Sequence, residues 1–153
     1  MRNIDVFWIS LIILSFQMTQ ISSSVTITLS SSMTDTTEDS YTISSNILTL
    51  TSNEEYLIKG SCSECGIEVN KKISPTITLS SISIDNSQTG PFVIKKSANV
   101  NLILEGISTI IDKETDESSS DFEGAGIKFK SGSNLTISGT GTLIVNIWLL
   151  WQQ

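Results

Sequence analysis

The sequence lacks histidine altogether, and Arg2 is its only arginine. The remaining basic residues are lysines, from Lys59 to Lys130. Without an imidazole there is no Ser-His-Asp triad, although a Ser-Lys pair stays open. A lysine general base needs a depressed pKa, and nothing in the sequence indicates the burial that would lower it. We therefore expect a protein that binds its target and is not an enzyme.

Two further shortages narrow the kind of ligand. The formal net charge is -7, so the surface lacks the clustered Lys and Arg that bind phosphates, and we expect no nucleic-acid partner. Residues 47–146 contain no tryptophan, and their only aromatic residues are Tyr56, Phe92, Phe122 and Phe129. A flat aromatic platform for stacking sugars is therefore not expected. Polar and ionic contacts would have to hold the ligand.

Residues 1–22 have the pattern of a secretory signal peptide. Basic Arg2 precedes an apolar run over residues 6–16, and small residues follow at 22–24. The apolar run is too short to span a bilayer. We expect a secreted or cell-surface protein with no membrane insertion after signal cleavage. An uncleaved anchor or a buried apolar helix is the alternative.

The rest of the chain divides into three segments. Residues 23–46 are rich in Ser and Thr and predict an N-terminal strand and connector, and residues 147–153 form an apolar C-terminal tail. Between them, residues 47–146 carry short alternating segments rich in Ile, Val, Thr and Leu, which predict β-strands. No helical period is convincing after the signal segment. The fold class is therefore all-β.

The strands recur as three similar triplets. These are GIEV–TITL–ISI, PFVI–NLIL–ISTII and GIKF–NLTI–TLIV. Such repeats predict a parallel β-helix, or β-solenoid, of about three coils, with Leu79, Leu104 and Ile137 in one interior row. A β-sandwich, which also has many short strands, is the alternative.

Cys62 and Cys65 lie close together in the sequence GSCSECG. In a secreted chain they are candidates for a disulfide that staples a turn, or for two idle thiols. A redox CxxC pair normally opens a helix, and no helical pattern follows Cys65.

The order and spacing of several phrases resemble the pectate-lyase-like β-helical carbohydrate-binding domain family of secreted bacterial proteins. The matching phrases are SNEEYLIKG (52–60), GIEVNKKISPTITLSSISIDNSQTGPFVIKK (66–96), NVNLILEGISTIID (99–112) and GAGIKFKSGSNLTISGTGTLIVN (124–146). The resemblance implies a right-handed parallel β-helix that binds acidic polysaccharide with help from Ca2+ and does not cleave it. The match covers residues 47–146 and then stops, so we expect a minimal or truncated member.

An acidic segment over residues 112–123 separates the second triplet from the third. Its carboxylates are candidate ligands of Ca2+, which prefers oxygen ligands in flexible loops. The candidate metal ligands are Asp112, Glu114, Asp116, Asp121 and Glu123. Glu117 occupies the place where an EF-hand needs Gly, so that motif is rejected. The alternative is a solvated acidic loop.

Lysines recur after equivalent strands of the triplets and predict a basic ladder that contacts an anionic sugar. These candidate ligand-binding residues are Lys71, Lys72, Lys95, Lys96, Lys128 and Lys130. Ordinary outward-facing lysines are the alternative. Asn134 opens the single N-glycosylation sequon of the sequence, which matters only in a eukaryotic secretory route.

These observations favour a secreted, non-catalytic module that binds polysaccharide, with Ca2+ as the candidate cofactor. Two other interpretations stay open: a structural or adhesive cell-surface β-solenoid, and a truncated polysaccharide lyase.

Overall fold

The computed structural model describes residues 24–87, 90–113 and 124–147. The predicted signal peptide and residues 148–153 of the predicted tail lie outside this part of the chain. Strands and turns make up the described residues, and no helix occurs among them. The all-β class is therefore confirmed. Within the same ranges, no helix has the length and hydropathy needed to cross a membrane.

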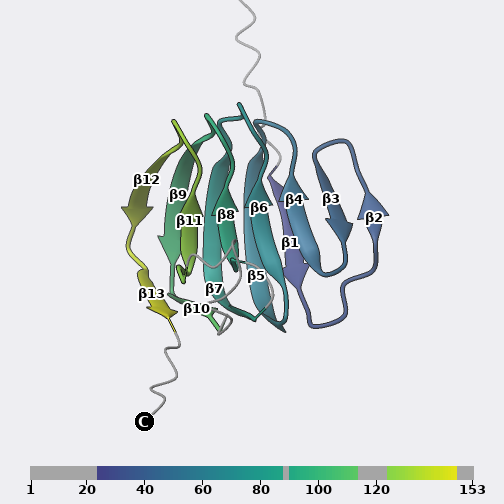
Figure 1. The fold of residues 1–153 in the computed structure, drawn as a ribbon, viewed down its shortest axis with the longest axis vertical. Helices are drawn as coiled ribbons and strands as arrows, with labels where there is room; N and C mark the ends of the chain where they lie inside the picture. The colour runs from purple at the N-terminus through teal and green to yellow at the C-terminus, as the bar shows by residue number, and fades with distance from the viewer. Residues whose placement is uncertain (1–23, 88–89, 114–123, 148–153) are drawn as a thin grey trace, which may run out of the picture.

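Thirteen strands form two sheets, which lie as two layers in Figure 1. We call the seven-stranded sheet A and the six-stranded one sheet B. Sheet A contains β1 (Val25–Leu29), β5 (Glu55–Ser63), β7 (Thr76–Asn86), β9 (Asn99–Glu105), β10 (Ile107–Asp112), β12 (Asn134–Gly139) and β13 (Thr142–Ile147). Sheet B contains β2 (Thr36–Thr37), β3 (Tyr41–Ser44), β4 (Ile47–Leu50), β6 (Gly66–Val69), β8 (Phe92–Ile94) and β11 (Ile127–Phe129).

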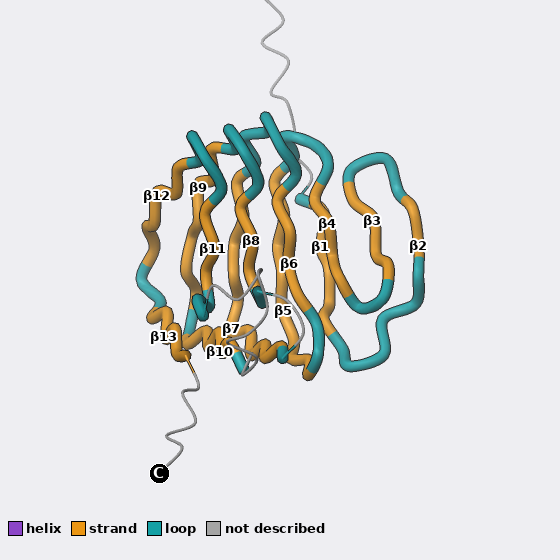
Figure 2. The backbone as a smooth tube through the Cα atoms, in the orientation of Figure 1, coloured by secondary structure: helices purple, strands orange, loops and turns teal. Residues whose placement is uncertain are grey.

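From β4 onward, the chain passes back and forth between the two sheets, as the tube in Figure 2 traces. Strands β6, β8 and β11 of sheet B each lead into a strand of sheet A, namely β7, β9 and β12. Each strand pairs in parallel with the equivalent strand of the preceding passage. Antiparallel pairing occurs only at β2–β3 and β3–β4 among the described strands.

The core lies between the two sheets and consists of apolar side chains in register. In sheet A, Tyr56 lies opposite Ile77, and Ile77 lies opposite Leu102. All three side chains are buried. Alternate residues of a strand face opposite sides of the sheet, so parallel strands in register bring inward side chains into continuous rows. Each strand thereby covers the apolar side chains of its neighbour.

One predicted interior row has a different third member. Leu79 lies opposite Leu104, as the repeat predicted, but Ile137 lies opposite Leu102. Gly139 takes the place beside Leu104, where the backbones approach so closely that a Cβ would collide with the Leu104 carbonyl oxygen. Asn134, the first residue of β12, lies opposite Asn99, the first residue of β9. This pairing differs by two residues from the register that the repeat predicted.

The buried rows predict that a Leu→Ala substitution lowers the free energy of unfolding far more on the inner face of sheet A than on its outer face. Leu102→Ala removes a fully buried side chain and should lower the free energy of unfolding by about 2–5 kcal/mol. Leu57→Ala, on the outer face of β5 where the side chain is half-buried, should cost clearly less. Urea denaturation of both variants measures the difference. Equal losses would contradict the placement of Leu102 in the core.

Candidate functional site

The turns that follow β6, β8 and β11 stack directly on one another. They stand side by side along one edge of the molecule in Figure 2. Backbone hydrogen bonds join them: the Lys95 amide donates to the Val69 carbonyl at 3.0 Å, and the Lys130 amide donates to the Ile94 carbonyl at 2.9 Å. Farther into the turns, the Lys72 amide donates to the Lys96 carbonyl at 3.2 Å. The turn residues therefore follow the register of the strands.

A left-handed residue at the same position gives the three turns a common shape. Lys72, Ser97 and Gly132 have φ angles of 64°, 60° and 72°. The left-handed region is unfavourable for residues with a Cβ, so Lys72 and Ser97 adopt it under the constraint of the surrounding turn. Only the third turn relieves that strain with glycine. The common shape places side chains of equivalent residues next to one another.

Four of the predicted lysines form two short rows on these turns. Lys95 and Lys130 each follow the last residue of their strand, and Lys71 and Lys96 occupy the next turn position. The side chains of Lys71, Lys96 and Lys130 are exposed. We call these four residues the lysine turns. They present ammonium groups along the direction in which the strands stack.

The other members of the predicted ladder differ in their surroundings. Lys72 is exposed, but its counterparts in the next two turns are Ser97 and Gly132, so it starts no row. Lys128 lies within β11, opposite Val93, and its exposed fraction is 6%. Its aliphatic stem packs so closely on Gly90 that a Cβ there would clash with it. Lys128 is therefore apart from the lysine turns.

Lys95 already has a partner within the protein. Its Nζ lies 2.5 Å from a carboxylate oxygen of Glu68 on the neighbouring strand β6. The same Glu68 oxygen accepts a hydrogen bond from Thr49 Oγ1 at 3.5 Å. Both side chains of the ion pair remain partly exposed, at 38% for Lys95 and 29% for Glu68. The pair leaves less positive charge at Lys95 than at Lys71 and Lys96.

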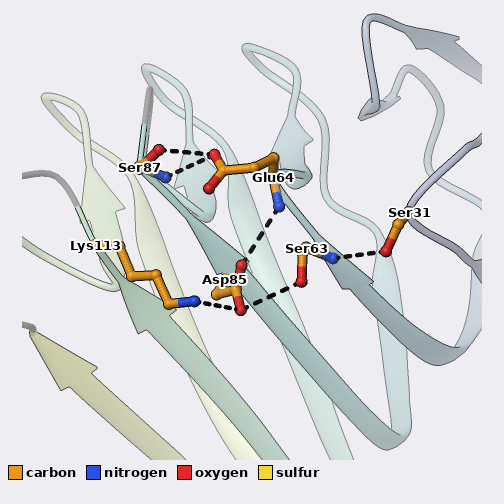
Figure 3. A network of polar contacts seen from close by, with 6 residues as sticks. All are labelled: Ser31, Ser63, Glu64, Asp85, Ser87 and Lys113. Carbon is orange, nitrogen blue, oxygen red and sulfur yellow. Dashed lines mark hydrogen bonds and ion pairs between the residues drawn. The ribbon is translucent and has the colours of Figure 1, made fainter.

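A second polar cluster occupies the opposite connections, where chain leaves sheet A for sheet B (Figure 3). Asp85 is its centre: one carboxylate oxygen accepts from the Glu64 amide at 3.4 Å, and the other lies 2.8 Å from Lys113 Nζ. The Ser63 hydroxyl donates to the latter oxygen at 3.5 Å. These contacts tie together the ends of β5, β7 and β10. We call this group the Asp85 network.

The network continues to the next residues on each side. Both the amide and the hydroxyl of Ser87 donate to one oxygen of Glu64, at 3.0 Å and 2.9 Å. The Ser63 amide donates to Ser31 Oγ at 3.0 Å, which joins the N-terminal segment to the cluster. The carboxylates of Glu64 and Asp85 thus accept hydrogen bonds from the protein itself. Their arrangement stabilises the connections and does not resemble a paired acid and base across a cleft.

Sequence reasoning did not find the Asp85 network. Its members are ordinary Ser, Asp, Glu and Lys residues from strand ends far apart in the chain. Their positions could have indicated the contact, because Asp85 and Lys113 lie near the ends of β7 and β10, which are neighbouring strands. Using that signal requires the register of β7 against β10, which the sequence alone leaves open.

Asp112 is the one predicted metal ligand within the described residues. It ends β10 fully buried, opposite Asn86, and the adjacent Lys113 amide donates to the Asn86 carbonyl at 2.8 Å. The other four, Glu114, Asp116, Asp121 and Glu123, lie outside the described residues. Within residues 24–87, 90–113 and 124–147, no group of three or more His, Cys, Asp and Glu could hold a metal ion.

Cys62 and Cys65 form a disulfide that bridges the end of β5 and the start of β6. Both cysteines are buried, and the Cys65 carbonyl accepts a hydrogen bond from Asn86 Nδ2 at 3.0 Å. The disulfide thus lies beside the Asp85 network. Asn134, the sequon residue, is exposed at the start of β12, and its Nδ2 donates to Asn99 Oδ1 at 2.8 Å. Its glycosylation stays a prediction.

The ion pair of the Asp85 network should contribute measurably to stability. In a double-mutant cycle with Asp85→Asn and Lys113→Gln, we expect a coupling energy of about 0.5–1 kcal/mol, since both side chains are partly exposed. The coupling should fall as salt is added. Exposed Glu105→Gln, paired in the same way with Lys113→Gln, serves as the control. A coupling no larger than in the control would show that the pair contributes nothing.

Comparison with known protein families finds a match over most of the described residues. Residues 44–147 match the family model described as carbohydrate-binding domain-containing protein. The matched stretch extends from the end of β3 to the end of β13 and includes both the lysine turns and the Asp85 network. No curated protein and no solved structure matches the chain.

Proposed function

The chain belongs to the family of carbohydrate-binding domain-containing proteins, and we propose that it is a secreted module that binds acidic polysaccharide without cleaving it. The observation that supports the acidic ligand best is the register of the lysine turns. Lys71 and Lys96 follow neighbouring strands at the same turn position and are both exposed. Neighbouring strands of a sheet lie about 4.7–4.9 Å apart. A chain of uronic acids, with one carboxylate on each sugar, can run along such a row.

The overall charge of the protein confines this binding mode to few places. With a formal net charge of -7, the protein as a whole repels a polyanion. Single exposed ion pairs contribute little, with a median of about 0–1 kcal/mol. Affinity would then come from several such contacts made at once along one polymer. The lysine turns offer repeated contacts, whereas isolated lysines such as Lys59 do not.

For the architecture we infer a right-handed parallel β-helix of about three coils, related to pectate lyases. The parallel pairing of successive passages and the in-register apolar rows support this proposal. A β-sandwich also has two sheets, but its strands are antiparallel and its connections run as Greek keys. Here antiparallel pairing is restricted, among the described strands, to the hairpins around β3.

The absence of catalysis is supported by what the chain lacks. It has no histidine, and its only arginine lies in the proposed signal peptide. The carboxylates of the Asp85 network accept hydrogen bonds from the protein, Lys95 is paired with Glu68, and Lys71, Lys96 and Lys130 are exposed on turns and not held within a cleft. Neither group has the properties of a general base.

Calcium binding is a separate proposal, because the acidic segment that carries its candidate ligands begins at a different edge of the molecule from the lysine turns. Asp112 ends β10, so the acidic segment begins beside the Asp85 network, at the opposite connections from the lysine turns. Carboxylate oxygens suit Ca2+ chemically, and Asp112, Glu114, Asp116, Asp121 and Glu123 would hold it. Bound there, Ca2+ would supply a positive charge to a polyanion.

Titration calorimetry tests the calcium proposal. We expect heat of binding on adding Ca2+ to the full chain, and its loss in the Asp116→Ala and Asp121→Ala variants, each of which removes a carboxylate ligand. Exposed Glu105→Ala, outside the segment, should leave the heat unchanged. Wild-type protein without any heat of binding would refute the site.

The lysine turns predict a local effect on polysaccharide binding. Lys96→Gln removes one ammonium group from the row and should weaken binding of polygalacturonate about two- to fivefold. The matched control is Lys59→Gln, another exposed lysine, on the outer face of β5, which should bind as the wild type does. Affinity electrophoresis or calorimetry measures both. Added salt should weaken the wild type more than the variant.

Three outcomes would point elsewhere. Equal affinity of both variants would remove the lysine turns from the proposal. No retention of any glycan, with or without Ca2+, would favour a structural or adhesive role. Absorbance from unsaturated uronate after incubation would show lyase activity and refute the non-catalytic role.

A further inference from the structure

Strands β2 and β12 lie at opposite ends of the molecule in Figure 1, and the two ends differ in how their apolar side chains are covered. Near β2, the edge strand of sheet A is β1, and its Ile27 and Leu29 are only 4% and 2% exposed. Met33, Tyr41 and Ile43 pack against the same core. Residues of the chain itself therefore close this end.

At the other end, β11, β12 and β13 each pair with a strand on one side only among the described strands. The side chains of Phe129, Ile137 and Val145, one on each of these strands, are 52%, 50% and 42% exposed. Their register neighbours one strand earlier are all fully buried, namely Ile94, Leu102 and Ile110. The exposed side chains thus face inward, and no described strand covers them. We call the surface formed by β11, β12 and β13 the open end.

The backbone of the open end offers hydrogen bonds as well. The Asn134 amide, at the start of β12, donates to the Ala98 carbonyl at 2.9 Å. Successive residues of a strand direct their amides to opposite sides, so the amides of Leu135 and Ile137 point away from β9. An edge strand with such a row of donors and acceptors is a template for pairing with another strand. The open end therefore combines apolar side chains with the backbone groups that a further strand would pair with.

The open end is also neutral. Residues 134–147, which include β12 and β13, contain no charged residue and no proline. Natural edge strands are commonly protected from pairing by lysine, proline or a bulge. The whole chain has a formal net charge of -7, so two copies repel each other except where a neutral surface lets them meet. An acidic or a basic partner would find no opposite charge on these two strands.

We propose that the open end binds the open end of a second copy of this chain. A two-fold axis presents the same surface on both sides of the contact, and strands that meet across it run antiparallel. Each copy then covers Phe129, Ile137 and Val145 of the other, and the edge strands pair. The closed end near β1 and β2 has no such exposed row, so association stops at the dimer.

Sedimentation of the full chain over a range of protein concentrations tests the association. We expect a reversible dimer that added salt does not weaken, because the contact is apolar and salt screens the mutual repulsion of the copies. A monomer at every concentration would overturn the proposal. So would assemblies larger than the dimer, or a dimer that dissociates as salt is added.

A pair of variants localises the contact. Ile137→Asp buries a charge without a partner and should weaken the dimer about tenfold or more. Ile107→Asp is the matched control, because Ile107 is 64% exposed on β10, which lies one strand in from β13. This control should dimerise as the wild type does. Circular dichroism verifies that both variants keep their strands, and equal weakening by the two would contradict the proposal.

Amide hydrogen exchange on the unaltered chain gives an independent test. The amides of Leu135 and Ile137 should exchange more slowly as protein concentration rises, since dimer formation pairs the edge of β12. Amides of β1, the edge strand at the other end of sheet A, serve as the control and should not respond to concentration. Concentration-dependent protection of β1 in place of β12 would assign the contact to the other end.

Discussion

The in-register stacking of apolar side chains between parallel strands is the interaction on which the rest of this structure depends. Tyr56, Ile77 and Leu102 cover one another because three successive strands keep the same phase of their pleat. A slip of one residue would turn a whole strand's apolar side chains outward. Everything that connects the strands must therefore preserve register, and the repeated left-handed residue after β6, β8 and β11 does so at one edge.

That constraint separates the molecule into a uniform interior and two unlike edges. At one edge the turns are fixed by backbone hydrogen bonds, so the side chains of Lys71 and Lys96 are left exposed. At the other edge, side-chain contacts hold the connections in place, since Asp85 contacts both Glu64 and Lys113. Polar side chains that already hydrogen-bond within the connections are poor candidates for binding a ligand. The lysine turns are for this reason the better binding surface.

Local periodicity of apolar residues is the part of the sequence from which the fold can be predicted. Alternating apolar residues identified the strands and the all-β class, and the equal spacing of TITL and NLIL placed Leu79 beside Leu104. The position of Ile137 was predicted two residues out of register, because the acidic segment hides the true repeat length. Lys128 resembled the other lysines in sequence, yet it lies within a strand and is buried. Its environment depends on long-range packing that a triplet pattern does not contain.

Stacking in one direction also decides how a binding surface of this kind can grow. Each further passage between the sheets adds one turn, and hence at most one more lysine to each row. Under the proposed binding mode, affinity for a polymer would increase with the number of passages, while any single contact would remain weak because it is solvated. The terminal strands differ from the inner ones, since each has a neighbouring strand on one side only and its inward side chains are covered on that side alone. Among the described strands, stability therefore places its strongest demand on β11, β12 and β13, whose inward side chains Phe129, Ile137 and Val145 are 52%, 50% and 42% exposed.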